Sequence, residues 1–156
     1  MAHEISTSGF KIGYKVETTA GSIPTGSFTN IPNIKAISEI NPEPATYDVT
    51  DLSDTVWKRY IGALKDIGGA ISLTANITEQ FKTAWASCVS SAQTAEASSL
   101  SMWFEVLVPG WSEGFFFAGM PSELGLPGIE TDAVFEGDVF ITPNQIKGWN
   151  TKADIA

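Results

Sequence analysis

The chain has 156 residues, of which 43% are hydrophobic and only 17% charged, and its formal net charge is −9. A domain of this length buries roughly two-thirds of its unfolded surface, so extensive disorder is excluded. The excess of 18 acidic over 9 basic residues argues against nucleic-acid binding by phosphate neutralisation, which requires clustered lysine and arginine. With so few charges, we expect part of the surface to be buried against a partner.

Cysteine and histidine are too scarce for most catalytic and metal chemistry. A single cysteine, Cys88, and a single histidine, His3, exclude an intrachain disulfide, a cysteine-based zinc site and the Cys–His and Ser–His–Asp arrangements. The first residues lack the pattern of a signal peptide, and no apolar stretch approaches the roughly 20 residues of a membrane span. We therefore expect a cytoplasmic protein that is not an enzyme and that uses no cofactor, metal or membrane.

Alternating apolar residues predict a series of strands in chain order. The segments with this pattern are residues 10–17, 34–40, 70–77, 100–108, 115–120 and 132–142, with a shorter one at 47–49. In residues 100–108 neither face is purely polar, because Trp103 and Leu107 accompany Glu105 on the face opposite Phe104. Pro109 to Gly114 has the composition of a hairpin loop.

One amphipathic helix is predicted at about residues 78–92. Thr78 is suited to the N-cap, and Glu79 lies in the first turn, where the helix dipole favours an acid. Apolar residues follow at helical spacing at Phe81, Trp85, Cys88, Val89 and Ala92. We expect the Ala/Ser-rich stretch at 90–99 to fray, Trp85 and Trp103 to lie in the core, and Cys88 to be a buried small hydrophobe.

The pattern of many strands around one helix predicts a mainly β fold. We expect two packed antiparallel sheets, as a sandwich or partly open barrel, flanked by the helix. The chain forms a single domain over residues 1–156, with a long loop at 43–68 and terminal arms at 1–9 and 143–156. Residues 54–66 fit either a short helix or an extended loop, and the sequence does not choose between them.

Acidic residues form two groups that invite a functional interpretation. Asp48, Asp51 and Asp54 are spaced by three and do not match a calcium loop, so Asx turns and a helix cap are favoured. The second group comprises Glu130, Asp132, Glu136 and Asp138. For this group an acidic solvated face is favoured over a carboxylate pair of the glycosidase kind.

Three of the five tryptophans, Trp57, Trp111 and Trp149, lie outside the periodic core. Exposed aromatic side chains favour contacts between subunits. The alternative is a β-sandwich carbohydrate-binding module that stacks sugars on these three rings.

Two blocks of the sequence resemble a known family. Residues 46–78, TYDVTDLSDTVWKRYIGALKDIGGAISLTANIT, are similar to the stretch of siphovirus major tail (tail tube) proteins in which an acidic, aromatic-containing loop leads through a Gly-Gly turn and a strand into the single helix. The later segments MWFEVLVPG, FFFAGM and VFEGDVFITPNQIKGW resemble the second half of the family. The likeness covers roughly residues 10–150 as an order of elements. The type VI secretion tube protein is similar in fold.

The resemblance implies a structural protein of a bacteriophage tail. Its subunits would form hexameric rings that stack into a tube, and its acidic lumen would conduct DNA during ejection without binding it. Its other partners would be a tape measure protein inside the tube and terminator and tail tip proteins at its ends. It would be assembled in the bacterial host cytoplasm and reside in the virion tail, which is contractile or non-contractile.

The resemblance also points to contact residues. The long loop would reach a neighbouring subunit or ring, and the arms would make further contacts. The expected loop contacts are Tyr47, Val49, Leu52, Val56, Trp57, Tyr60 and Leu64. Glu136 and Asp138 are the candidate lumen-facing acids, and Trp149 is the expected contact of the C-terminal arm.

Overall fold

The computed structural model describes residues 9–41, 43–66 and 69–156. It divides into two compact units, which we call the body (Met1–Ser38 and Ala70–Ala156) and the hairpin unit (Glu39–Gly69). The expected N-terminal arm, residues 1–9, lies outside the described residues except for Gly9, as do residues 67 and 68 of the expected long loop.

The body contains a seven-stranded antiparallel sheet in the order β2-β1-β7-β8-β9-β6-β3. Its strands are β1 (Lys11–Val16), β2 (Thr29–Asn30), β3 (Ile34–Ile37), β6 (Ile71–Asn76), β7 (Met102–Leu107), β8 (Glu113–Pro121) and β9 (Glu136–Thr151). The hairpin unit contributes a second, two-stranded antiparallel sheet of β4 (Glu43–Asp48) and β5 (Tyr60–Asp66). The predicted mainly β class with two antiparallel sheets and one helix is confirmed, and the described strands do not close a barrel.

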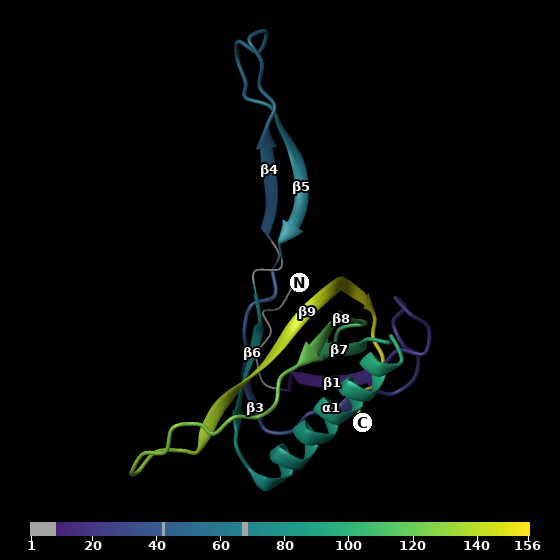
Figure 1. The fold of residues 1–156 in the computed structure, drawn as a ribbon, viewed down its shortest axis with the longest axis vertical. Coiled ribbons are helices and arrows are strands. Elements are labelled where there is room, and N and C mark those ends of the chain that lie inside the picture. Colours follow the sequence, from purple (N-terminus) through teal and green to yellow (C-terminus); the bar gives the residue numbers. More distant parts are fainter. Residues whose placement is uncertain (1–8, 42, 67–68) are drawn as a thin grey trace. The chain divides into compact units, whose positions relative to one another are not determined.

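The long strand β9 links two parts of the seven-stranded sheet, β2-β1-β7-β8 on one side and β6-β3 on the other. Its first residues, Glu136 to Ile141, pair with β6, and residues from Ile141 to Thr151 pair with β8. Figure 1 shows β9 changing direction sharply between these two parts. The strand therefore runs through Pro143 to Thr151 instead of ending at residue 142, and most of the expected C-terminal arm lies in the sheet. Pro143 fits because the register shifts between Ala118 and Gly119, opposite this point.

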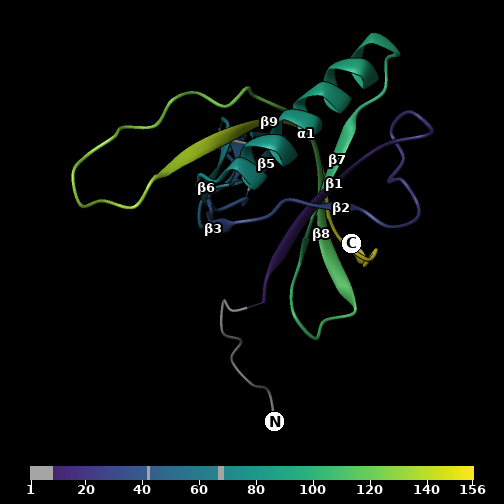
Figure 2. The same ribbon diagram turned by 90° about the horizontal axis from the view of Figure 1, so that it is seen from below.

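The helix α1 (Glu79–Ala97) packs against β1, β7 and β8. Thr78 caps it as predicted, since its side chain accepts a hydrogen bond from the Phe81 N–H at 3.1 Å. The helix continues to Ala97, past the predicted end at residue 92, because Ala92 and Ala95 are buried and hold its last turns against the body. Figure 2 shows α1 lying across the β-sheet.

Both faces of β7 are buried, which explains its mixed sequence pattern. One face carries Met102 and Phe104, and Phe104 stacks on Phe117 with ring centroids 5.4 Å apart. The opposite face carries Trp103 in a separate hydrophobic cluster with Phe28, Phe116, Ala118 and Ile155. Trp85 and Trp103 are fully buried, as expected, and so is Cys88.

Candidate interaction surfaces

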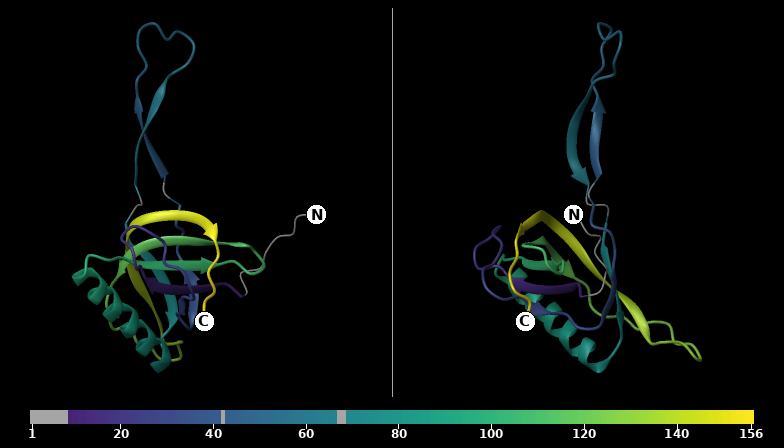
Figure 3. Two further views of the ribbon diagram at one scale, coloured as in Figure 1. Left: turned by 90° about the vertical axis from the view of Figure 1, so that its right-hand side faces the viewer. Right: turned by 180° about the vertical axis from the view of Figure 1, so that it is seen from behind.

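The hairpin unit exposes nearly all of the large apolar side chains that the structure describes in it. The sequence left open whether residues 54–66 form a short helix or an extended loop. They contain no helix: residues 54–59 belong to the loop, and Tyr60–Asp66 is strand β5. Figure 3 shows the unit as a twisted two-stranded ribbon ending in an open loop. The exposed apolar residues are Tyr47, Val49, Leu52, Val56, Trp57, Tyr60 and Ile61. The expected contact Leu64 lies in β5, but its side chain is outside the described residues, and Ile61 is an exposed neighbour that the sequence did not single out.

The tip of the hairpin, residues 49–59, is held in shape by its own polar groups. Arg59 is clamped between two carboxylates: its Nε donates to Asp54 Oδ2 at 2.7 Å and its Nη2 donates to Asp51 Oδ2 at 3.0 Å. Its backbone N–H donates to Thr50 Oγ1 at 2.8 Å, and its carbonyl accepts from the Val49 N–H at 2.9 Å. These bonds fix the loop backbone without burying any of its apolar side chains.

Two of the three aspartates in this region form Asx turns, as expected. Asp48 accepts from the Thr50 N–H at 2.9 Å, and Asp51 accepts from the Ser53 N–H at 2.8 Å. Hydrogen bonds from Thr50 and from Ser53 lower the pKa of Asp48 and of Asp51, respectively. The expected helix cap is not formed, because no helix begins here. Asp54 instead binds Arg59 and the Asp51 N–H.

At the tip, Leu52, Val56 and Trp57 are 103%, 79% and 82% exposed. A fixed backbone that presents three exposed apolar side chains is suited to insertion into another surface. The loop is already ordered, so binding would cost little further backbone entropy. The hairpin unit can therefore act as a pre-formed contact element.

A second apolar surface lies on the body, and the sequence analysis did not identify it. The connection between β8 and β9, residues 122–135, extends from the sheet as an open loop (Figure 2). It exposes Leu126, Ile129, Val134 and Phe135. A groove of about 540 Å³ separates part of this loop from α1 and includes Trp85 and Val89 in its lining. The signal in the sequence was that residues 122–135 contain five large apolar residues, Leu124, Leu126, Ile129, Val134 and Phe135. The predicted strand at 132–142 begins later than expected, at Glu136, so residues 132–135 belong to this loop.

The candidate lumen acids Glu136 and Asp138 lie on one exposed face of β9. Glu136 forms an ion pair with Lys35 of β3, and Asp138 accepts a hydrogen bond from Thr74 Oγ1 at 2.6 Å. Each carboxylate thus has its own partner: that of Asp138 lies on the adjacent strand β6, and that of Glu136 lies on β3, beyond β6. The face also includes the half-exposed Phe140, and the acids occupy the end of the sheet formed by β9, β6 and β3.

Trp149 lies in strand β9, within an exposed aromatic cluster. Its ring is 5.3 Å from that of Trp111, at 49°, and 5.5 Å from that of Phe115, edge to face. Trp111 and Trp149 are 44% and 48% exposed. The structure therefore brings together two of the three tryptophans outside the periodic core, while Trp57 belongs to the hairpin unit.

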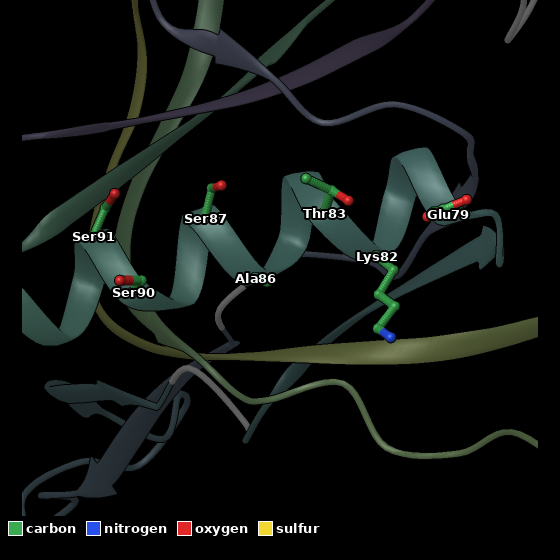
Figure 4. A pocket seen from close by; sticks show the side chains of 7 residues that line it. All are labelled: Glu79, Lys82, Thr83, Ala86, Ser87, Ser90 and Ser91. Atoms are coloured by element: carbon green, nitrogen blue, oxygen red, sulfur yellow. The ribbon is translucent and has the colours of Figure 1, made fainter.

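The outward face of α1 is mainly polar and rich in serine. Figure 4 shows 7 residues around a shallow hollow there, with Lys82 pointing away from Ser87 and Ser91. Cys88, on the opposite face, is buried, and burial raises the pKa of its thiol.

Within residues 9–41, 43–66 and 69–156, no group of three or more His, Cys, Asp or Glu side chains is arranged to hold a metal ion. No described helix is long and apolar enough to cross a membrane.

Solved structures share this fold. A chain in the tube-terminating cap of the anti-feeding prophage aligns with a TM-score of 0.62 and 10% identity, over 97% of this chain and 94% of its own. A chain in the six-fold symmetrised baseplate of the anti-feeding prophage aligns with a TM-score of 0.56 and 7% identity, over 95% and 97%. No protein-family model matches the sequence, and none of the curated proteins matches it. At this level of identity the likeness establishes a common fold, spanning nearly the whole of each chain.

Proposed function

We propose that this chain is a structural subunit of a bacteriophage tail or tail-like particle, and specifically the subunit that builds the tail tube. The observation that carries the proposal is the hairpin unit, whose apolar side chains are exposed on a backbone fixed by its own hydrogen bonds. A lone monomer gains nothing from exposing Leu52, Val56 and Trp57, whereas a neighbouring subunit can bury them.

The shared fold supports this role. The cap and the baseplate of the anti-feeding prophage each contain a chain that aligns with this one over almost its full length. In the proposed assembly, subunits form hexameric rings and rings stack into a tube. Strand β3 is one edge of the seven-stranded sheet, and pairing with a neighbouring subunit would satisfy its free backbone groups.

The remaining parts of the proposal concern the lumen and the partners. The net charge of −9 suits a channel through which DNA slides without adhering, and Glu136 and Asp138 are the proposed lumen-facing acids. Trp149 is proposed as a further subunit contact. A tape measure protein would occupy the tube, and terminator and tail tip proteins would close its ends. The particle would be assembled in the host cytoplasm and the subunit would remain in the virion.

The proposal is tested by electron microscopy of the purified protein over a concentration series. We expect rings or hollow tubes for the wild type and none for Trp57→Ala, while circular dichroism shows that the variant is folded. Lys58→Ala is the matched control, because it changes the neighbouring tip residue without removing apolar surface, and it should still assemble. Tubes of normal length from Trp57→Ala would contradict the role given to the hairpin. Single subunits from the wild type at every concentration, with and without a tail tip complex as initiator, would contradict the tube.

One observation favours a second candidate, a carbohydrate-binding module. Trp111 and Trp149 form an exposed aromatic pair on one surface of the body. Their rings are inclined at 49° and do not make a flat platform, which is less suited to stacking on a sugar ring. Calorimetric titration with a panel of glycans separates the two functions: heat of binding that disappears in Trp149→Ala would favour the module.

A further inference from the structure

Two glutamates in the body are almost completely enclosed, and their carboxyl groups are satisfied to very different degrees. Glu17 is 3% exposed and accepts three hydrogen bonds. Its Oε1 accepts from the Ser101 N–H at 2.8 Å, and its Oε2 accepts from Trp103 Nε1 at 2.8 Å and the Gly21 N–H at 3.0 Å. Both carboxyl oxygens of Glu17 therefore have hydrogen-bond donors.

Glu105 is 0% exposed and has a single partner. Its Oε1 accepts from the Ala153 N–H at 3.0 Å, and its Oε2 has no hydrogen-bond partner in the structure. A buried carboxylate with one donor is strongly disfavoured, whereas a protonated carboxyl needs fewer partners. The side chain is tightly enclosed, since a Cβ atom at Gly114 would lie 2.6 Å from Glu105 Oε1.

Residues 152–156, which we call the clip, cover this carboxyl and extend the edge of the sheet beyond β2. The Phe28 N–H donates to the Asp154 carbonyl at 2.7 Å, and the Ala156 N–H donates to the Phe28 carbonyl at 2.9 Å. Ile155 pairs with Phe28 in a parallel bridge and lies in the cluster that includes Trp103. Figure 2 shows the C-terminal end of the chain beside β2. On the other sides Glu105 is bounded by the paired strands β1 and β8.

The charged groups around Glu105 come mainly from the clip. Asp154 disfavours the ionised carboxyl and Lys152 favours it, but burial outweighs both and raises the pKa of Glu105 from 4.5 to about 7. In β1 the residue paired with Glu105 is Gly13, and in β8 it is the uncharged Phe116. Lys11 and Lys15 occupy the adjacent positions of β1 on the same face, and Lys15 donates to the Thr25 carbonyl. Glu17, which contacts Trp103, is a further charged group on this face.

We propose that the clip is a proton-controlled latch: it closes over Glu105 when this carboxyl carries a proton, and ionisation of Glu105 releases it. The reason is geometric. The ionised group requires water or further donors, and β1 and β8 are fixed in the sheet, so the clip is the element that can move aside. Release uncovers Phe28, Trp103 and Phe116 and frees the N–H groups of Phe28 and Asn30. The latch is a property of the isolated subunit and does not rest on the proposed tail function.

Hydrogen exchange of the full chain tests the latch. With a pKa of about 7 for Glu105 in the closed form and 4.5 in the open form, the opening constant rises about thirty-fold between pH 5.5 and pH 8. Protection factors of the Phe28, Asn30 and Ala156 amides, corrected for intrinsic exchange, should fall by that factor. The Asn76 amide, which donates to the Asn33 carbonyl at 3.0 Å elsewhere in the body, should keep its protection.

Two variants complete the experiment. Glu105→Gln mimics the protonated carboxyl and should reduce the change in clip protection to less than about three-fold. Glu17→Gln, the matched change at the other enclosed glutamate, should leave the pH response of the clip intact. Equal responses in Glu105→Gln and the wild type, or a parallel loss of protection at Asn76, would overturn the latch.

A measurement on the wild type makes the test independent of variant folding. The ¹³C shift of the Glu105 carboxyl reports its titration directly. A midpoint that coincides with the loss of clip protection supports the latch, and a clip that stays protected after Glu105 has titrated overturns it.

Discussion

The body and the hairpin unit are stabilised in opposite ways. The body buries large side chains on both sides of β7, including Trp85, Trp103, Phe104 and Phe117. Among the described side chains of the hairpin unit none is buried, and its tip is fixed by Arg59 and its hydrogen-bonded aspartates. A two-stranded hairpin alone is at best marginally stable in water. The difference indicates that the body supplies the folding free energy, while the hairpin unit presents exposed apolar surface.

The largest expected effect on stability comes from the core of the body. Phe117→Ala should lower the free energy of unfolding by about 3–5 kcal/mol, because it leaves a cavity beside Phe104. Guanidinium unfolding followed by tryptophan fluorescence measures the change. A loss below about 1 kcal/mol would mean that the body does not depend on this packing.

The next effect concerns pH and Glu105. An acid whose pKa is raised in the folded protein holds a proton that the unfolded chain has already released, so stability falls as pH rises. With the pKa raised from 4.5 to about 7, the decline should occur between these two values and level off above them. Its size should be roughly 2–3 kcal/mol. Denaturant unfolding at a series of pH values, with Glu105→Gln as the reference lacking this decline, measures it.

A smaller effect is expected for the clamp at the hairpin tip. Arg59→Ala removes ion pairs to Asp51 and Asp54. Because the side chains of Arg59 and Asp51 are more than half exposed, the global stability should change by less than about 1 kcal/mol. The local effect should be clear: exchange of the Asp51 amide, which donates to Asp54 at 3.0 Å, should accelerate. An unchanged rate would show that the turns hold the tip without Arg59.

Trp57→Ala should have the smallest effect on the subunit itself. Its side chain is 82% exposed, so the free energy of unfolding should stay within about 0.5 kcal/mol of the wild type. The thermal midpoint checks this expectation. A large loss of stability would show that Trp57 packs within its own subunit, and the contrast between the two units would then fail.

The sequence was sufficient for the elements that bury one face. Alternation predicted β1 and β6, and Thr78 with the helical spacing after it predicted α1, because these patterns follow directly from side-chain direction. The hairpin strands β4 and β5 were largely missed. None of their described side chains is buried, so apolar and polar residues need not alternate along them. The second half of β9 was missed because Pro143 usually ends a strand, and only its partner strand shows that it lies opposite a register shift.

The candidate surfaces were predicted unevenly. Exposed loop aromatics such as Trp57 were found because they fall outside any periodic pattern. Glu105 was read only as a polar residue on the second face of its strand, although its neighbours Trp103 and Leu107 already marked that face as apolar. Its environment depends on residues 152–156, which no local pattern brings to β7, and the order of the seven strands likewise depends on long-range pairing.

The position of the hairpin unit within the chain has an evolutionary consequence. Strands β3 and β6 are antiparallel neighbours, and Ser38 and Ser72 close the pair through two hydrogen bonds of 2.9 and 3.0 Å. The whole of residues 39–69 therefore occupies the place of an ordinary turn between two paired strands. Such an insertion can be lengthened, replaced or transplanted while the sheet that carries it keeps its register, so the exposed apolar surface of the hairpin unit can diverge faster than the scaffold.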